Sequence, residues 1–147
     1  MAQPSDPGAV ERRPFEYAVI QIVPRVERGE AFNAGVIDHS RPHRYLGARM
    51  HLDAALLRAL APACDAAAVC EHLDAIRRIA EGAADAGPIA RLSAPERFHW
   101  LVAPSSTIVQ PAEVHTGMTS DPTATLEQLF RSLVLREGPS GTGTIGA

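Results

Sequence analysis

The pattern of apolar and polar positions predicts three strands near the start of the chain. Residues 17–24, YAVIQIVP, are apolar on both faces except at Gln21 and rich in β-branched residues, which is typical of a strand buried on both sides. Residues 34–38, AGVID, and 44–50, RYLGARM, follow as shorter strands separated by a turn that contains Pro42. Strands joined by such short links most simply form an antiparallel meander.

Helical spacing and capping side chains predict three helices. Asp53 stands where the cap of a helix over 54–61 is expected, and Asp65 caps a second helix with apolar residues at 69, 73, 76 and 80. Asp121 and Pro122 are the cap and first residue of a third helix, with an apolar face. Gly138 is expected to close this last helix.

Two further strands complete the predicted sheet. In residues 97–103, RFHWLVA, Phe98 and Trp100 would share one face, and residues 107–110, TIVQ, form the fifth strand. The segment 110–122 is expected to be a loop. The fold class is therefore α+β: an antiparallel sheet of about five strands with three helices packed against it.

The domain boundaries follow from the proline and glycine positions. Residues 1–14 and 138–147 are predicted to be flexible N-terminal and C-terminal tails, because they combine Pro, Gly and polar residues without an apolar pattern. A single α+β domain is expected over 15–137.

Composition and charge exclude several kinds of chemistry. All 14 basic residues are arginine, so Schiff-base catalysis and a phosphate loop with its lysine are excluded. A net charge of −3 makes nucleic acid an unlikely partner. No segment is long and apolar enough for a membrane span, and the N-terminus lacks the apolar core of a secretory signal, so we expect a cytoplasmic protein without membrane contact. His39 and His43 flank a turn but match no metal-ligand spacing, and we expect no metal, cofactor or catalytic residue set.

The link between the first two strands is the leading candidate for a binding site. It is long for a hairpin and contains Arg25, Glu27, Arg28 and Glu30, which alternate in sign. Each guanidinium would be held by a carboxylate and so oriented toward a planar anion. The alternatives are solvated loop charges that form weak pairs, or a catalytic centre.

Amide side chains supply the other candidates. Gln21 lies in an apolar strand, Asn33 precedes the second strand, and Gln110 occupies a similar position in the fifth strand. Because an unpaired buried amide is costly, either each amide bonds to nearby backbone or they line a polar pocket together with Arg97 or His99.

In the order and spacing of four segments, the sequence resembles a bacterial family known as domain of unknown function 3037. The resemblance rests on YAVIQIVPRVERGEAFNAGVI, YLGARMHLD, RFHWLVAPSSTIVQP and HTGMTSDPTATLEQLF, which together span nearly all of the predicted domain. Asp38 stands where the family pattern leads us to expect an apolar residue. The resemblance implies no activity, but genes of this family often lie beside one for a kinase-like protein, which implies a partner or accessory role.

Two hypotheses follow from the sequence. The first is a non-enzymatic interaction or accessory domain, whose possible partner is the kinase-like protein. The second is a small enzyme that acts on a phosphate- or carboxylate-bearing substrate through the loop Arg25–Asn33, with arginines as the anion clamp and Glu27 or Glu30 as base.

Overall fold

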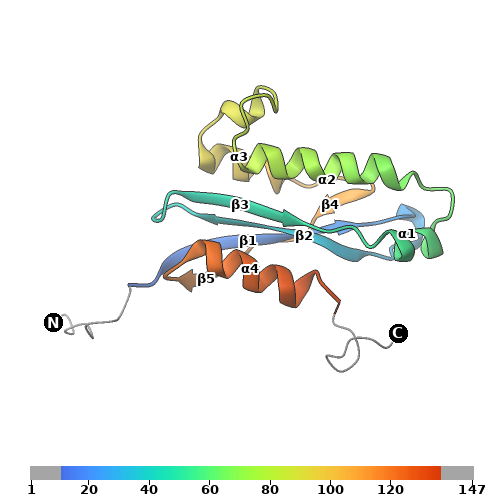
Figure 1. Cartoon of the computed structure of the whole chain (residues 1–147), viewed down its shortest axis with the longest axis horizontal. Helices are drawn as coiled ribbons and strands as arrows, with labels where there is room; N and C mark the ends of the chain where they lie inside the picture. The colour runs from blue at the N-terminus through green and yellow to red at the C-terminus, as the bar shows by residue number, and fades with distance from the viewer. Residues whose placement is uncertain (1–10, 137–147) are drawn as a thin grey trace.

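The computed structural model describes residues 11–136, which form one α+β domain around an antiparallel sheet (Figure 1). The predicted fold class is confirmed. The strands are β1 (Arg13–Ile22), β2 (Phe32–Ser40), β3 (Tyr45–Met50), β4 (Val109–Pro111) and β5 (His115–Thr119). The α-helices are α1 (Ala54–Leu60), α2 (Ala66–Ala80), α3 (Ala94–Leu101) and α4 (Pro122–Leu133), and the short 3-10 helices are η1 (Val26–Arg28) and η2 (Ile89–Arg91).

The first three strands form the predicted antiparallel meander. The strand order is β3-β2-β1-β4, and β5 also pairs with β1. The two late strands share one edge of β1, since β5 lies beside its first half and β4 beside its last residues. Because β1, β2 and β3 pair in antiparallel fashion, the turn from β1 to β2 and the turn from β2 to β3 lie at opposite ends of the sheet (Figure 1).

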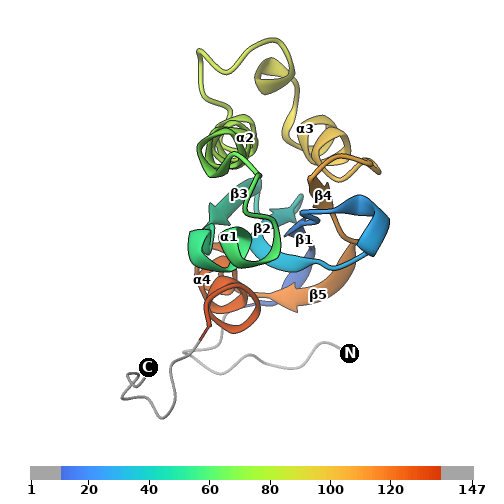
Figure 2. The same cartoon turned by 90° about the vertical axis from the view of Figure 1, so that its right-hand side faces the viewer.

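Helices cover both faces of the sheet. Figure 2, which views the molecule from the end, shows α2 and α3 on one side of the strands and α4 on the other. The larger core cluster lies under α2 and α3 and includes Ile20, Ile22 and Leu73. A smaller cluster, which includes Val36 and Phe130, lies under α4. β2 is buried along nearly its whole length. In β1, which was predicted to be buried on both sides, Ala18, Ile20 and Ile22 are fully buried on one face, whereas the other face is only partly buried.

Capping side chains begin three of the helices as predicted. The side chains of Asp53, Asp65 and Asp121 accept hydrogen bonds from backbone N–H groups in the first turns of α1, α2 and α4. Each cap satisfies donors that have no intrahelical acceptor. These polar signals are local, which is why they could be read from the sequence.

The strand predicted over 97–103 is wrong, because this segment lies in helix α3. Ser93 accepts from the N–H of Glu96, and the Glu96 carboxylate accepts from the N–H of Ser93, which is a capping box. In the helix Phe98 is buried while Trp100 is 51% exposed, so these residues do not share a face. The domain therefore has four α-helices where the sequence predicted three.

The late strands also differ from the prediction. The strand predicted over 107–110 is β4, shifted to Val109–Pro111, and the segment predicted as a loop contains β5. β5 has little apolar alternation of its own; it is held by pairing with β1, where the ring of Phe15 packs against Gly117. A side chain at 117 would collide with that ring, whose nearest atom would lie 2.7 Å from its Cβ.

The ends of the predicted domain are placed only in part. β1 begins at Arg13, inside the predicted N-terminal tail, and α4 ends at Leu133. Residues 1–10 of the predicted N-terminal tail, the whole predicted C-terminal tail and the closure of the last helix at Gly138 lie outside the described residues. Within residues 11–136, no helix is long and apolar enough to cross a membrane.

Candidate functional site

The link between β1 and β2 forms a charged turn, the name we use for residues 24–31. Arg25 Nε donates to Glu27 Oε2 at 3.0 Å, and Arg28 donates through Nε and Nη2 to the two carboxylate oxygens of Glu30, each at 3.0 Å. Gly29 adopts a φ of 74°, which allows the chain to leave η1 and enter β2. Each arginine of the turn thus forms an ion pair with a carboxylate, and the pair of Arg28 with Glu30 is bidentate, as expected.

These pairs lie on the surface, and they shift the acid–base properties of the carboxylates. The pKa of Glu27 is lowered by a backbone hydrogen bond and by the hydrogen bond from Arg25. The pKa of Glu30 is lowered by its hydrogen bonds from Arg28, whose own pKa is raised. Both carboxylates are therefore held ionised and are weak proton acceptors.

An apolar cavity adjoins the charged turn. Its volume is about 510 Å³, and it is lined by Pro24, Arg25, residues 60–65 between α1 and α2, and Ile108. Val26, the first residue of η1, is 53% exposed. The turn thus combines exposed apolar surface with a rim of paired charges.

Three amides lie in a row across the neighbouring strands. Gln21 of β1 is the register partner of Asn33 on one side and Gln110 on the other. Gln21 Nε2 donates to Asn33 Oδ1 at 3.4 Å, and Asn33 Nδ2 donates to the carbonyl of Leu133 at 2.8 Å. Gln110 Nε2 donates to the Thr107 carbonyl at 2.7 Å.

The hydrogen bonds of the amides are mostly local to the fold. Asn33 and Gln110 bond to backbone, and Asn33 satisfies a carbonyl at the end of α4 that has no intrahelical donor. Asn33, which also accepts from Gln21, is thus the amide that connects the sheet to α4. Arg97 and His99 belong to α3, which covers the other face, so the structure does not bring them together with Gln21.

Arg97 lies far from the charged turn. Its Nη1 donates to the Leu92 carbonyl at 2.7 Å and its Nη2 to the Ala80 carbonyl at 3.2 Å. Ala80 ends α2, whereas the start of that helix adjoins the cavity beside Arg25. At ~1.5 Å per residue the helix is roughly 22 Å long. Arg97 therefore ties α3 to the end of α2 and does not belong to the same site as Arg25.

Asp38 is a buried carboxylate that was not among the candidate site residues predicted from the sequence. It lies within β2, between its register partners Tyr17 and Gly47, and it is fully buried. Neither carboxylate oxygen has a hydrogen-bond partner, and burial raises the pKa of Asp38 to about 7. The available signal was a carboxylate inside an apolar strand, where burial without a partner is costly.

The histidines beside Asp38 do not join it in a metal site. His43 Nε2 lies 3.1 Å from the Thr119 carbonyl oxygen, and His39 stacks on Phe98 under α3. Asp38 and His39 are consecutive in a strand and point to opposite faces. Among residues 11–136, no three His, Cys, Asp or Glu side chains are grouped so that they could hold a metal ion.

One comparison with known proteins gives a match. The model of the family described as Protein of unknown function (DUF3037) matches residues 17–134. No curated protein and no solved structure matches the chain. The matched segment runs from β1 to the end of α4, so it includes the charged turn, the amide row and Asp38.

Proposed function

The chain belongs to the family Protein of unknown function (DUF3037), as its sequence predicted, and on that premise we propose that it is a non-enzymatic interaction domain of the bacterial cytoplasm. Its binding surface is the charged turn with the adjoining cavity. The observation that supports this proposal most directly is the composition of the turn. Val26 is exposed and both arginines are paired with carboxylates, while Pro24 and Arg25 line an apolar cavity of about 510 Å³.

This surface has the composition of a protein interface. Interfaces combine an apolar centre with a polar rim and are enriched in arginine. Val26 and the cavity supply the centre, and Arg25 and Arg28 supply the rim. Because each guanidinium already has a carboxylate partner, part of the side-chain ordering that binding requires is complete before the partner arrives.

The acid–base properties of the turn favour binding over catalysis. A general base works best when its pKa lies near the working pH. The pKa values of Glu27 and Glu30 are lowered from the ordinary glutamate value by their hydrogen bonds, which moves both side chains away from that range. The alternative, a small enzyme acting on an anionic substrate through residues 25–33, has less support for this reason.

The partner we propose is the kinase-like protein that the family resemblance implies. A surface with both signs of charge around an apolar centre fits a protein partner with matching charges better than a polyanion. The net charge of −3 also disfavours a nucleic acid.

The direct test is association between the purified chain and the kinase-like protein, measured by calorimetry. Val26→Asp should weaken binding at least about tenfold, because it places a carboxylate in the apolar centre of the interface. Val114→Asp is the matched control, since Val114 is another exposed valine, 38% exposed, in the link between β4 and β5. It should bind as the wild type does.

Arginine variants test the rim of the same surface. Arg25→Ala should weaken binding, whereas Arg131→Ala, which removes an exposed arginine paired with Glu127 on α4, should not. A wild-type chain that does not associate with the kinase-like protein would refute the partner. Equal effects of the paired variants would refute the surface.

The enzyme alternative has its own test. A screen of phosphoester and nucleotide substrates should show no turnover that depends on Glu27. A reaction that the wild type catalyses and Glu27→Gln does not would overturn the non-enzymatic proposal.

A further inference from the structure

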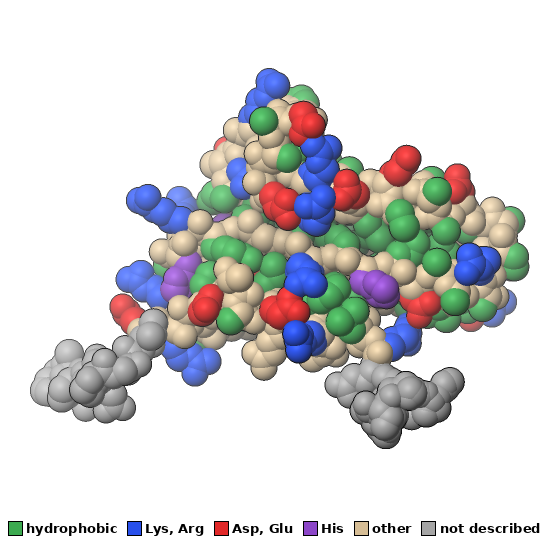
Figure 3. Space-filling view, in the orientation of Figure 1, with side chains coloured by type: hydrophobic (Ala, Val, Ile, Leu, Met, Phe, Trp, Pro, Cys, Tyr) green, Lys and Arg blue, Asp and Glu red, His purple; other side chains and the backbone are tan. Residues whose placement is uncertain are grey.

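A second cavity lies at the opposite end of the sheet from the charged turn. Its volume is about 400 Å³. It is bounded by the end of β2, the turn from β2 to β3, and the first residues of α3. The lining residues are His39, Ser40, Arg41, Arg44, Tyr45 and 93–95. Figure 3 shows arginine side chains projecting at this end of the molecule.

The two arginines of this cavity differ from those of the charged turn. Arg41 and Arg44 are exposed, and neither forms an ion pair with any carboxylate of residues 11–136. Their guanidinium groups are thus available to an anion from outside the domain. A planar guanidinium offers paired N–H donors that match the oxygens of a phosphate or carboxylate.

A buried histidine in the wall of this cavity also has a polar atom without a partner. His39 is 6% exposed and stacks on Phe98, with ring centroids 4.8 Å apart. Its Nδ1 lies 3.4 Å from Glu16 Oε1 on β1, and its Nε2 is buried without a partner. His39 is also one of the residues that line the cavity, together with the turn from β2 to β3 and the start of α3. A buried polar atom without a partner calls for an external one.

The start of α3 adds a further donor. As the first helical residue, Ala94 has an N–H with no intrahelical acceptor, and the helix dipole favours negative charge at this end. The Glu96 carboxylate is occupied by the N–H and the hydroxyl of Ser93, at 3.2 and 2.8 Å. The capping box therefore gives acceptors to the N–H and hydroxyl of Ser93, and it leaves the Ala94 N–H free to donate to a ligand.

We propose that this cavity binds a small molecule that carries a phosphate monoester, with Arg41 and Arg44 as the main anion donors and His39 at its inner wall. Donors that come from the turn, the sheet and a helix start suit a tetrahedral anion, whose oxygens point in several directions, better than a planar carboxylate. The cavity volume is in the range of small-molecule sites. The proposal is independent of the charged turn and of its partner.

Amide chemical shifts measured during titration provide the test. Inorganic phosphate, sulfate and ethyl phosphate should each shift the amide signals of residues 40–44 and of Ala94 saturably at millimolar concentration. Ethyl phosphate should displace inorganic phosphate from the same residues, and ethanol should have no effect. Shifts that do not saturate, or ethyl phosphate that fails to compete, would overturn the proposal.

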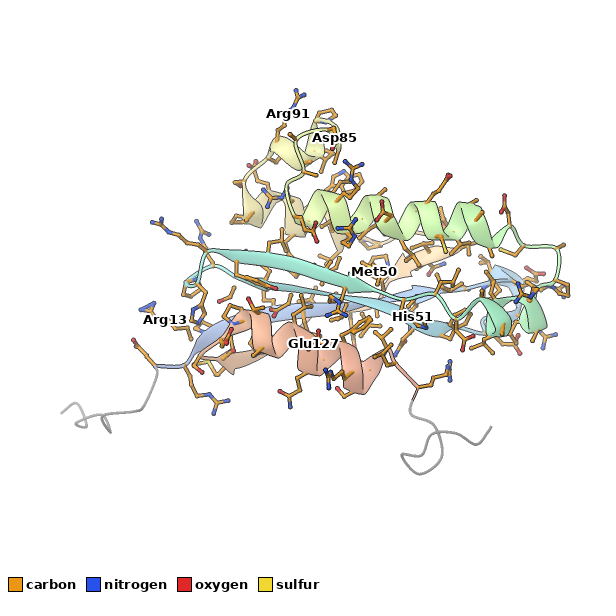
Figure 4. The ribbon with its side chains drawn as sticks, viewed as in Figure 1. Arg13, Met50, His51, Asp85, Arg91 and Glu127 are labelled. Carbon is orange, nitrogen blue, oxygen red and sulfur yellow. The ribbon has the colours of Figure 1, made fainter. Side chains whose placement is uncertain are left out.

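Matched variants identify the donors. Arg41→Gln and Arg44→Asn should each weaken binding about tenfold or more, the usual cost of a lost charge-assisted hydrogen bond. Asparagine is chosen at 44 because Arg44 has a φ of 53°, which asparagine tolerates. Arg91→Gln is the control; Figure 4 shows Arg91 on the connection between α2 and α3, which projects away from the sheet. It should leave binding unchanged.

The role of His39 has a separate test. His39→Gln removes the imidazole ring from the wall of the cavity and should weaken the binding of sulfate and of ethyl phosphate, whereas the control Arg91→Gln should not. Unchanged affinity for both anions in His39→Gln would remove His39 from the site.

Discussion

The two ends of strand β2 differ because, among the described residues, only the far end has charged or polar side chains that lack partners. At the start, Asn33 donates to a carbonyl at the end of α4, and in the charged turn Arg28 is held by Glu30 through two hydrogen bonds. Toward the far end, the buried carboxylate of Asp38 has no hydrogen-bond partner, and Arg44 has no carboxylate partner among residues 11–136.

Polar groups that have partners within the domain stabilise the fold, whereas polar groups without partners do not. A satisfied amide or ion pair contributes modestly to stability and leaves few donors for a ligand. A buried polar group without a partner lowers stability and leaves its donors or acceptors unused within the fold. Variants at both ends of the strand test this distinction.

The largest expected effect is at Asp38. Burial raises the pKa of this carboxyl from 3.8 to about 7 in the folded protein. The folded state therefore binds the proton more tightly than the unfolded chain, and the free energy of unfolding falls as pH rises from about 4 to about 7, then levels off. Asp38→Asn cannot ionise and should be more stable than the wild type at about pH 8, by up to about 4 kcal/mol at ~1.4 kcal/mol per pKa unit.

Chemical denaturation across this pH range is the measurement. The two proteins should have nearly equal stability at about pH 4, where the Asp38 carboxyl is protonated in the folded state. Asp85→Asn is the control, because the Asp85 side chain is 81% exposed and its only described partner is Arg78. A wild type that is as stable as Asp38→Asn at about pH 8 would show that the carboxylate finds partners in solution. Asp38 would then no longer distinguish the far end of β2 from its start.

A smaller effect is expected at Asn33, at the start of the strand. Asn33→Ala removes the donor to the Leu133 carbonyl and the acceptor for Gln21 Nε2, so it should cost about 1–3 kcal/mol in the free energy of unfolding. Hydrogen exchange should speed up in the last turn of α4. Gln110→Ala, which loses one exposed bond to the Thr107 carbonyl, is the control and should cost less.

Equal losses in these two amide variants would mean that Asn33 does not connect the sheet to α4. The start of the strand would then lack the structural role that we assign to it. Loss of α4 protection without loss of overall stability would limit the role of Asn33 to the end of that helix.

Most of the fold could be predicted because its signals are local. The caps at Asp53, Asp65 and Asp121, and the apolar runs of the first three strands, each identify an element without knowledge of its neighbours. Helix α3 was missed because the alternation in 97–103 resembles a strand, while the capping box formed by Ser93 and Glu96 was overlooked. Strand β5 depends on pairing with residues about a hundred positions earlier, which no local pattern reveals.

In the candidate sites, too, contacts between residues close in sequence could be predicted and tertiary contacts could not. The ion pairs of the charged turn join residues two positions apart, so alternation of sign was enough to predict them. Arg97 was an alternative neighbour of Gln21 and Gln110 only because residues 97–103 were predicted to be a strand, whereas they lie in α3. The cavity of Arg41 and Arg44 depends on α3 lying over the turn from β2 to β3, and that contact is tertiary.

The smallest effect on stability is expected in the charged turn itself. Glu30→Gln removes the carboxylate that holds Arg28, but both side chains are solvent-exposed, so the pair is screened and adds little to the fold. Thermal unfolding should be unchanged within error at low and at high salt. Binding of the protein partner should nevertheless weaken, because Arg28 loses the orientation that its partner carboxylate provides. A variant that unfolds as readily as Asn33→Ala would place the turn among the structural elements, and the surface proposed for recognition would lose its main support.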